Sequence, residues 1–367
     1  MKKILSPRIA IYYDWLNQWG GAERLLLDLL SIFPKAKLYT SVHNPSATKW
    51  IPENIPVTAS FLNKIPLFKK NSIISALFQP IAIEQFRFNQ FDIVISLTSM
   101  HGQCLLTSPQ TLHICYCLTP NRYLYQKNYS FLIKPLITFY QKIDYCYAQR
   151  PDIYLAISKT VRHRIQKNYH RYAQIINPGV DISIFKPVPN PTNDYFLTVS
   201  RLVPHKNVDL AILSCLQTKN RLKIVNTGPE LPHLKKIAND SPLIEFVGTV
   251  SQANLVKLYQ NCQALICPQR EDFGLAALES LACGRPVIAF KEGGIGEIVI
   301  DNKNGLLFSE QSVTALTQTL KIFPKNKFIS QHCRERAIHF SKNKFMLSFK
   351  RIVLNVWKKY QLPTTTS

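Results

Sequence analysis

The stretch CPQREDFGLAALESLACGRPVIAF, residues 267–290, carries the strongest pattern in the sequence. An apolar strand end leads into a short loop and then into a helix, expected from about Phe273 to Cys283, where Gly284 ends it. Glu271 lies in the loop and Glu279 in the helix. Eight residues of helix span roughly 12 Å at about 1.5 Å per residue. The two acids therefore suit a ligand with hydroxyl-bearing rings on both sides of a phosphate.

Carboxylates accept hydrogen bonds from hydroxyl groups, and backbone N–H groups at a helix start attract phosphate. The N–H groups around Gly274 and Leu275 lie between the two acids. The alternatives are that Glu271 is an ordinary acid at a helix start and that Glu279 faces solvent. Glu279 lies within LAALESLA, where a solvated acid is less expected, and this favours a functional role.

A second pattern, FLTVSRLVPHKN at residues 196–207, places two cations between a strand and a helix. The strand is expected to end at Ser200 and the helix to begin near Asn207, so Arg201 and Lys206 lie in the connecting turn. Ligands of open α/β sheets bind beyond the carboxyl ends of the strands, where two cations can neutralise a diphosphate. Considered alone, two basic residues in a loop are usually solvated charge. Together with the two glutamates they predict a binding site.

The N-terminal stretch IYYDWLNQWGGAERLLLDLL, residues 11–30, is typical of a strand, a glycine loop and a helix. Gly20 and Gly21 allow a tight turn and close approach to an anion, although a plain turn explains them equally well. The sequence has no D-x-D pair of the kind that holds a divalent cation with sugar nucleotides. We therefore expect no metal and no other cofactor, with leaving-group charge met by cations and helix dipoles.

Short β-branched or aromatic runs alternate with stretches of helical period throughout the chain, which predicts an α/β fold of parallel sheets and crossover helices. The 367 residues suffice for two Rossmann-like domains. FKPVPNPTND, residues 185–194, has the prolines of a linker. We expect one domain at residues 1–185, a second at 186–340, and a last helix at 341–367 that packs on the second domain or crosses back to the first.

The net charge of +23 admits nucleic acid, an anionic membrane surface or a phosphorylated substrate as partners. The basic residues are spread through both halves, which disfavours a dedicated nucleic-acid module. The nine cysteines are scattered and show no zinc-type spacing. No signal-peptide core and no apolar run of about 18 residues is present. We therefore expect a cytoplasmic protein that is soluble or peripheral.

Seven segments in a fixed order together resemble glycosyltransferase family 4, the retaining group 1 glycosyltransferases of GT-B architecture, in which two Rossmann-like domains face each other across a cleft. The resemblance covers nearly the whole chain. Its segments are WGGAE (19–23), SRLVPHKN (200–207), NTGP (226–229), FVGTV (246–250), EDFGLAALE (271–279), CGRPVIAFKEGGIGEIV (283–299) and NGLLF (304–308).

The resemblance implies a role for each matching residue. Arg201 and Lys206 would hold the diphosphate of a nucleotide-sugar donor, and Glu279 would hold the ribose hydroxyls. Glu271 would contact the donor sugar, helped by the backbone of Phe273, Gly274 and Leu275. Backbone groups near Val250 would contact the base. Gly20 and Gly21 would lie beside the diphosphate. The reaction implied is transfer of a hexose, in its narrowest form mannose from a GDP-linked donor, to a hydroxyl of a glycan or lipid-linked acceptor.

One departure from the family pattern lies in HICYCLTPNRYLY, residues 113–125, where Leu118 stands at the position of a common histidine. Either this subgroup reacts without that imidazole or the protein has lost turnover. The rival hypotheses are a non-catalytic nucleotide-sugar-binding protein, a sugar-nucleotide epimerase and, from the charge alone, a nucleic-acid binder. His101 and His113 are nearby in sequence, but a histidine beside a strand is more often structural.

The family also suggests an acceptor bound mainly by the first domain. FLNKIPLFKKNSIISALF, residues 61–78, mixes Lys64, Lys69 and Lys70 with large apolar residues and could rest on an anionic membrane face. A partly buried helix whose lysines reach water explains the same pattern equally well.

Overall fold

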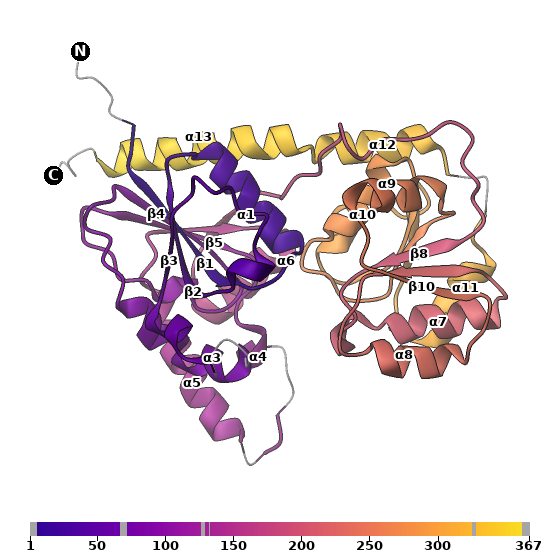
Figure 1. Cartoon of the computed structure of the whole chain (residues 1–367), viewed down its shortest axis with the longest axis horizontal. Coiled ribbons are helices and arrows are strands. Elements are labelled where there is room, and N and C mark those ends of the chain that lie inside the picture. The colour runs from indigo at the N-terminus through magenta and orange to yellow at the C-terminus, as the bar shows by residue number, and fades with distance from the viewer. Residues whose placement is uncertain (1–5, 67–71, 126–128, 132, 325–327, 362–367) are drawn as a thin grey trace. The chain divides into compact units, whose positions relative to one another are not determined.

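The computed structural model of the chain describes residues 6–66, 72–125, 129–131, 133–324 and 328–361 (Figure 1). The chain divides into two compact units, each built on its own parallel sheet. Unit 1 comprises Met1–Ile176 and Met346–Ser367, and unit 2 comprises Asn177–Phe345.

Unit 1 contains a seven-stranded sheet in the order β3-β2-β1-β4-β5-β6-β7, and all its strand pairs are parallel. The central strands β4 and β5 are buried along their whole length, as expected for parallel strands covered by helices on both faces. The strands are β1 (Ile9–Leu16), β2 (Lys37–His43), β3 (Val57–Ala59), β4 (Ile93–Thr98), β5 (Leu112–Cys117), β6 (Ile153–Ala156) and β7 (Ala173–Ile175).

The helices of unit 1 connect these strands. In α1 the buried residues Leu25, Leu26 and Leu29 form an apolar stripe toward the sheet. Helix α6 begins after Ser158, whose hydroxyl accepts the N–H of Val161 and so caps the helix. The helices are α1 (Gly21–Ile32), α3 (Ser72–Glu84), α4 (Arg122–Tyr125), α5 (Lys134–Tyr147) and α6 (Lys159–Tyr169), with short 3₁₀ turns at Pro45–Ala47, Phe61–Lys64 and Gly102–Cys104.

Unit 2 contains a six-stranded parallel sheet in the order β10-β9-β8-β11-β12-β13. Its core joins Phe196, Ile266 and Ile288 from the strands with Ile212 and Leu316 from the helices. The strands are β8 (Phe196–Val199), β9 (Leu222–Val225), β10 (Ile244–Gly248), β11 (Leu265–Cys267), β12 (Val287–Phe290) and β13 (Gly305–Phe308). The helices are α7 (Val208–Gln217), α8 (Leu231–Ala238), α9 (Gln252–Asn261), α10 (Leu275–Ala282), α11 (Val313–Lys321) and α12 (Ser330–His339), with 3₁₀ turns η4 (Pro204–Lys206) and η5 (Gly294–Glu297).

The division between the units lies at Ile176, before the proline-rich segment that the sequence analysis used as the boundary. Residues 177–185 belong to unit 2 because they pack there: Phe185 is buried with its ring 5.9 Å from that of Tyr259, and Val180 pairs with Ser341. Prolines bias a segment toward extended conformations, but packing decides the unit to which it belongs.

The last helix, α13 (Lys342–Tyr360), begins in unit 2, and from Met346 onward it belongs to unit 1. Phe349 is fully buried in unit 1, with its ring 5.1 Å from Tyr116 and 6.5 Å from Phe33. Tyr360 near the end of the helix donates a hydrogen bond to the carbonyl of Pro109. This helix therefore completes the core of unit 1.

Nine strands expected from the alternating runs of the sequence are all found in the structure, and the expected α/β class is correct. The expected strands are Arg8–Tyr13, Phe91–Leu97, Leu112–Tyr116, Tyr154–Ser158, Tyr195–Ser200, Leu222–Asn226, Ile244–Val247, Ala264–Cys267 and Pro286–Phe290. The strands that the sequence analysis missed are β2, β3, β7 and β13. Within the residues that the structure describes, no helix is both long enough and apolar enough to cross a membrane.

Candidate functional site

The strand order of unit 2 reverses between β8 and β11. Strands β9 and β10 lie on one side of β8, and strands β11, β12 and β13 lie on the other side. The loops that follow β8 and β11 therefore leave the sheet at the same edge and diverge from each other. Open α/β sheets bind ligands at such a point, beyond the carboxyl ends of the strands. The loop after β8 carries Arg201 and Lys206, and the loop after β11 carries Glu271.

Lys206 and Glu271 form an ion pair across this point. The Lys206 Nζ lies 2.7 Å from the Glu271 Oε1, and the side chains are only 20% and 17% exposed. Gln269 donates a hydrogen bond from Nε2 to the same oxygen at 2.5 Å. Burial acts to raise the pKa of Glu271, but the charge of Lys206 and the two hydrogen bonds outweigh it and lower this pKa. Glu271 is therefore an anion at neutral pH, and it holds one cation at the sheet edge.

Close backbone contacts fix the loop that carries Glu271. Gly293 has φ +98°, and a Cβ there would lie 2.2 Å from the Glu271 carbonyl oxygen. The Gly294 N–H donates to that same oxygen at 2.7 Å, and a Cβ on Gly294 would lie 2.2 Å from the Asp272 carbonyl oxygen. The paired glycines of the KEGG segment are thus required by steric contact, because any side chain would push the Glu271 loop away.

The loop with Arg201 and Lys206 is fixed in a similar way. A Cβ on Gly228, in the NTGP segment, would lie 2.2 Å from the Leu202 carbonyl oxygen. The Leu202 N–H in turn donates to the carbonyl of Thr227. Arg201 is exposed at the start of this loop, and Lys206 is half-buried at its end. Both cations therefore belong to one loop, and Lys206 pairs with Glu271.

Helix α10 starts beside Glu271. Gly274 precedes it with φ +115°, a backbone conformation that suits glycine, and Phe273 is buried with its ring 5.9 Å from Phe340. Because Leu275 is the first helical residue, the first N–H groups of α10 have no acceptor within the helix. These N–H groups are the ones that the sequence analysis expects near a phosphate.

Glu279, one turn further along α10, is buried and only 4% exposed. Its Oε2 accepts a hydrogen bond of 2.8 Å from the hydroxyl of Tyr259, a fully buried residue of α9. The expectation that Glu279 is not a solvated acid is therefore correct. Val250 is half-buried just after β10.

In unit 1 the strand order reverses between β1 and β4, and the buried carboxylate of Asp14 bridges these two strands. It accepts hydrogen bonds from the Thr98 hydroxyl and the Ser99 N–H, both at 2.8 Å. Burial raises the pKa of Asp14 to about 6 even though these hydrogen bonds lower it. Sequence analysis missed Asp14. Its place as the charged residue of an otherwise apolar strand, IAIYYDWL at residues 9–16, was the available signal.

Gly20 and Gly21 lie just beyond β1, where Gly21 is the first residue of α1. A Cβ on Gly20 would lie 3.0 Å from the Glu23 Oε2, and the buried Glu23 accepts a hydrogen bond of 2.6 Å from the Tyr13 hydroxyl. The glutamate of the WGGAE segment thus holds the glycine loop against β1. This position at a sheet edge is the one expected from the sequence.

Leu118 directly follows β5, is half-buried, and donates its N–H to the Thr98 carbonyl at 2.7 Å. His101 and His113 are both buried, and burial lowers their pKa values to about 4 and about 3. Both imidazoles are therefore neutral and enclosed at neutral pH. Neither takes the place of the histidine that the family pattern has at residue 118.

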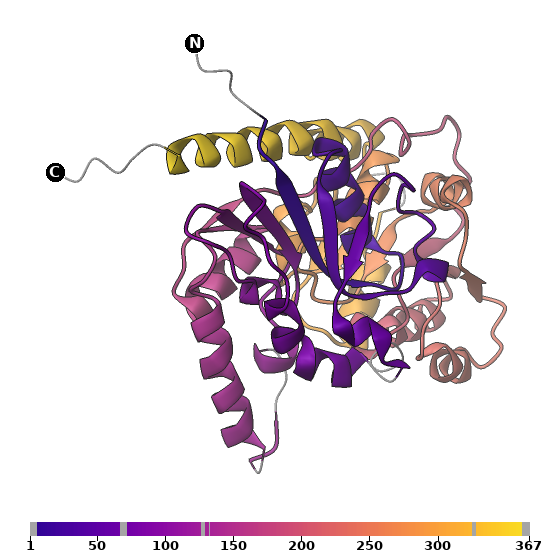
Figure 2. The same ribbon diagram turned by 60° about the vertical axis from the view of Figure 1, so that its left-hand side comes forward.

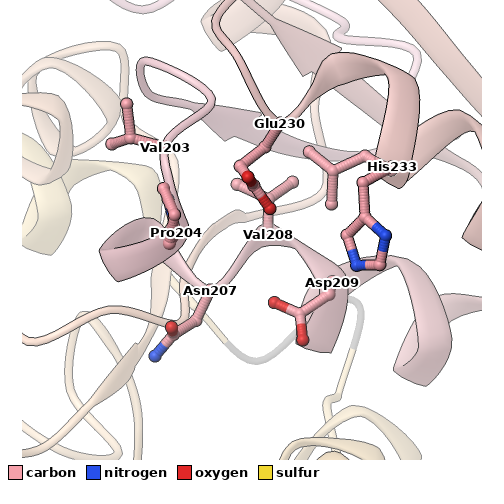
Figure 3. Close-up of a pocket in the computed structure, with 8 residues that line it drawn as sticks. Val203, Pro204, Asn207, Val208, Asp209, Glu230 and His233 are labelled. Carbon is pink, nitrogen blue, oxygen red and sulfur yellow. The ribbon is translucent and has the colours of Figure 1, made fainter.

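A hollow of about 230 Å³ lies beside η4 and the start of α7 (Figure 3). The side chains of Asp209, Glu230 and His233 surround it, while Arg201, Lys206 and Glu271 do not line it. Among the described residues, no group of three or more His, Cys, Asp and Glu side chains is arranged to hold a metal ion.

The described side chains within residues 61–78 differ in exposure. Leu62 is buried, whereas Lys64, Ile65 and Phe78 are exposed. Lys69 and Lys70, on which the expected membrane face depends, lie outside the described residues.

Comparison with solved structures defines the fold class. HepE of Anabaena in complex with UDP is 17% identical over 95% of this chain and 100% of that chain, with a TM-score of 0.73. Sucrose-phosphate synthase from Thermosynechococcus elongatus gives the same TM-score at 16% identity, over 96% of this chain and 100% of that chain. The chain has the GT-B fold of two Rossmann-like domains, as the sequence analysis predicted.

Sequence comparison relates the second unit to a family of enzymes. Residues 180–340 match the family described as "Glycosyl transferases group 1". An uncharacterized glycosyltransferase of Methanocaldococcus jannaschii is 31% identical over 57% of this chain and 59% of its own length. A GDP-mannose-dependent α-(1-6)-phosphatidylinositol monomannoside mannosyltransferase of Mycolicibacterium smegmatis is 28% identical over 45% of this chain and 51% of its own length. The match to the group 1 glycosyltransferases thus lies in the second unit, and the chain spans only about half the length of these curated relatives.

Proposed function

We propose that the chain is a retaining hexosyltransferase that moves a hexose from a nucleotide-sugar donor to a hydroxyl of a glycan or lipid-linked acceptor. The observation that carries this proposal is the Lys206–Glu271 ion pair at the point where the strand order of unit 2 reverses. A cation held there is suited to the diphosphate of a donor, and a carboxylate beside it is suited to the hydroxyls of a sugar.

In the proposed reaction the bond from the sugar C1 to the diphosphate oxygen breaks, and a bond from C1 to the acceptor oxygen forms on the same face. Negative charge develops on the departing diphosphate, where Arg201 and Lys206 stabilise it. The acceptor's proton passes to that diphosphate, so no protein side chain is needed as a covalent nucleophile. Glu271 orients the sugar through its hydroxyls, and no metal ion takes part.

The remaining donor contacts are proposed from the family pattern, residue by residue. Glu279 holds the ribose hydroxyls, and the N–H groups of Phe273, Gly274 and Leu275 approach the phosphates. Backbone groups near Val250 contact the base. Gly20 and Gly21, at the sheet edge of unit 1, leave room for the diphosphate.

The identity of the donor is the finer part of the proposal. The name of the Mycolicibacterium smegmatis relative gives it a GDP-mannose donor, whereas the solved HepE structures contain UDP or UDP-glucose. We propose mannose from GDP-mannose, because that relative is the more similar in sequence. We propose the cytoplasmic face of a membrane as the location of the reaction, and no nucleic acid as a partner.

Two measurements test this proposal. Thermal-shift screening against GDP-mannose, UDP-glucose and ADP-glucose is expected to raise the melting temperature for one donor, because a bound ligand stabilises the folded state. Release of nucleotide is then followed with that donor and a panel of sugar glycosides and lipid-linked sugars. Lys206→Ala and Glu271→Ala are expected to abolish the release. Retention of full activity in folded protein by either variant contradicts the assignment.

A matched control is available in the same unit. Lys223 and Glu245 form a similar ion pair, with 3.1 Å between Nζ and Oε2, on strands β9 and β10. Lys223→Ala removes a lysine and leaves a glutamate unpaired, as Lys206→Ala does. It is expected to leave donor binding and transfer unchanged.

A second candidate function is suggested by Leu118, which follows β5 where the family pattern has a histidine. A non-catalytic nucleotide-sugar-binding protein would show a donor-dependent thermal shift but no nucleotide release with any acceptor. A sugar-nucleotide epimerase would instead convert the donor with no acceptor present. Leu118→His distinguishes a chain that has lost turnover from one whose turnover is altered. If the chain lacks only this imidazole, the substitution restores activity.

A further inference from the structure

Gln269 lies in the loop between β11 and α10, and the protein encloses its side chain. Only 2% of the residue is exposed. Its Nε2 donates a 2.5 Å hydrogen bond to the Glu271 Oε1, the same oxygen that the Lys206 Nζ contacts at 2.7 Å. The Gln269 Oε1 is buried as well, and among the described residues it has no hydrogen-bond partner. The amide is therefore satisfied at one end and orphaned at the other.

The orphaned oxygen of Gln269 is unfavourable for the fold. A buried amide oxygen without a donor destabilises a folded chain, and an apolar side chain of similar shape avoids that loss. Gln269 follows the buried residues Ile266 and Cys267 closely, so methionine would suit the position. Within the described part of the chain, the contact that methionine could not replace is the hydrogen bond to Glu271. This bond indicates that Gln269 acts through that carboxylate.

Lys206 cannot serve Glu271 alone once a donor is bound in the way proposed above. The negative charge of a diphosphate attracts the same ammonium group, which then divides its attraction between two anions. That negative charge also opposes the ionised form of Glu271. Gln269 is neutral and enclosed, so a diphosphate does not draw it away. Its hydrogen bond is therefore the contact that Glu271 keeps in full.

The groups around Glu271 act on its charge in different directions. Burial acts to raise the pKa of Glu271, whereas the charge of Lys206 and then the hydrogen bond from Gln269 lower it. Asp272 in the same loop opposes the charged form. The thiol of Cys267, at the end of β11, is neutral because burial raises its pKa well above the usual range. Gln269 thus favours the anion without adding a charge.

We propose that Gln269 is a positioning residue for sugar transfer, which holds the Glu271 carboxylate in place and ionised while Lys206 also binds the diphosphate. The role toward a ligand rests on the proposed function. With Oε1 held by Gln269, the Glu271 Oε2 is the oxygen that accepts a hydrogen bond from a sugar hydroxyl.

The first test uses the ligand-free chain. The Glu271 carboxyl is titrated by carbon NMR with isotope-labelled glutamate, and its signal is assigned by its loss in Glu271→Gln. Gln269→Met removes both polar atoms and nearly keeps the shape of the side chain. It is expected to raise the pKa of Glu271 by about one unit or more, because the carboxylate loses a hydrogen bond that favours its charged form. An unchanged pKa overturns the proposal.

The second test measures kcat and KM with the donor that thermal-shift screening selects. Gln269→Met is expected to lower kcat by about tenfold or more and to change the donor KM by less than about threefold, because the contacts to the diphosphate remain. The acid limb of kcat, which reports groups in the enzyme–substrate complex, should move to higher pH.

Gln269→Glu should show the opposite trend with pH. Its activity relative to the parent is expected to rise as the pH falls, because a protonated carboxyl group at this position donates to Glu271 as the amide does. A residue that only supports the loop would give neither trend. If Gln269→Met transfers sugar at the parent's rate across the pH range, the proposal is overturned.

The matched control is Gln311→Met in the same unit. The Gln311 side chain donates a 2.9 Å hydrogen bond to the carbonyl of Pro268, so this variant removes a glutamine that contacts the same loop through its backbone. It is expected to keep the parent's kcat and pH profile. If the parent itself transfers no sugar, the proposed function fails, whereas the titration of Glu271 alone then supports or overturns the hold of Gln269 on this carboxylate.

Discussion

Replacing Lys206 with methionine removes one charge from the ion pair and leaves Glu271 without its cation. At 2.7 Å the gross Coulomb attraction is about 6 kcal/mol for an effective dielectric constant near 20, and desolvation offsets most of it. Since both side chains are largely buried, we expect the free energy of unfolding to fall by about 2 kcal/mol. For a unit of this size the melting temperature should fall by roughly 4–8 °C.

The same change removes a cation proposed to stabilise the departing diphosphate, which should lower the transfer rate by about 10²- to 10³-fold. Adding Glu271→Gln to Lys206→Met separates the two effects. The double variant has no unpaired charge to bury, so stability should largely return while transfer should not. Urea unfolding followed by circular dichroism measures stability, and initial rates of nucleotide release measure transfer. If the double variant regains transfer, Lys206 acts only on Glu271 and our reasoning is refuted. Lys223→Met is the control.

Four further predictions follow from the geometry. Gly293→Ala should lower the free energy of unfolding by more than about 2 kcal/mol, because it adds a steric clash to a strained backbone conformation. Gly248 also has a positive φ but has open space around it, so Gly248→Ala should lower the free energy of unfolding by only about 1–2 kcal/mol. Urea unfolding compares the two variants. Asp14 has its pKa raised to about 6, so it binds a proton more readily when folded; stability should fall by about 2 kcal/mol between pH 4 and pH 7, and Asp14→Asn should reduce that fall. Tyr259→Phe should lower stability by about 1.5–3 kcal/mol in urea unfolding, since buried Glu279 loses a hydrogen bond. Excess EDTA should leave the rate of nucleotide release unchanged; its loss, restored by Mg²⁺, would contradict a metal-independent reaction.

The central part of the site could be predicted because parallel sheets bring distant loops together. Lys206 and Glu271 are 65 residues apart in sequence, but each directly follows a recognisable apolar strand. Once both strands were assigned to one sheet, the two loops had to leave it at the same edge. Their pairing is observed, while their roles toward a ligand stay predictions.

Other features could not be predicted because a pattern of residues does not specify what covers them. The large apolar residues of α5 could also belong to a core helix, and only the structure shows that this helix extends away from the sheet of unit 1 (Figure 2) and that most of its side chains are exposed or half-buried. The amphipathic period of residues 342–360 shows that one face is buried, but not in which unit. The role of Asp14 depends on the end of β4, at Thr98 and Ser99, lying beside it in the sheet, and sequence spacing does not report this contact.

The way in which α13 completes unit 1 bears on how the protein is made. Unit 1 consists of the first 176 residues and of residues from 346 onward, so a ribosome must synthesise all of unit 2 before Phe349 can reach its buried place beside Phe33 and Tyr116. Until then the nascent unit 1 lacks part of its hydrophobic core, whereas unit 2 can fold as soon as its own residues emerge. A chain truncated near residue 340 would therefore have an incomplete core in unit 1, most of which comes from the other end of the sequence.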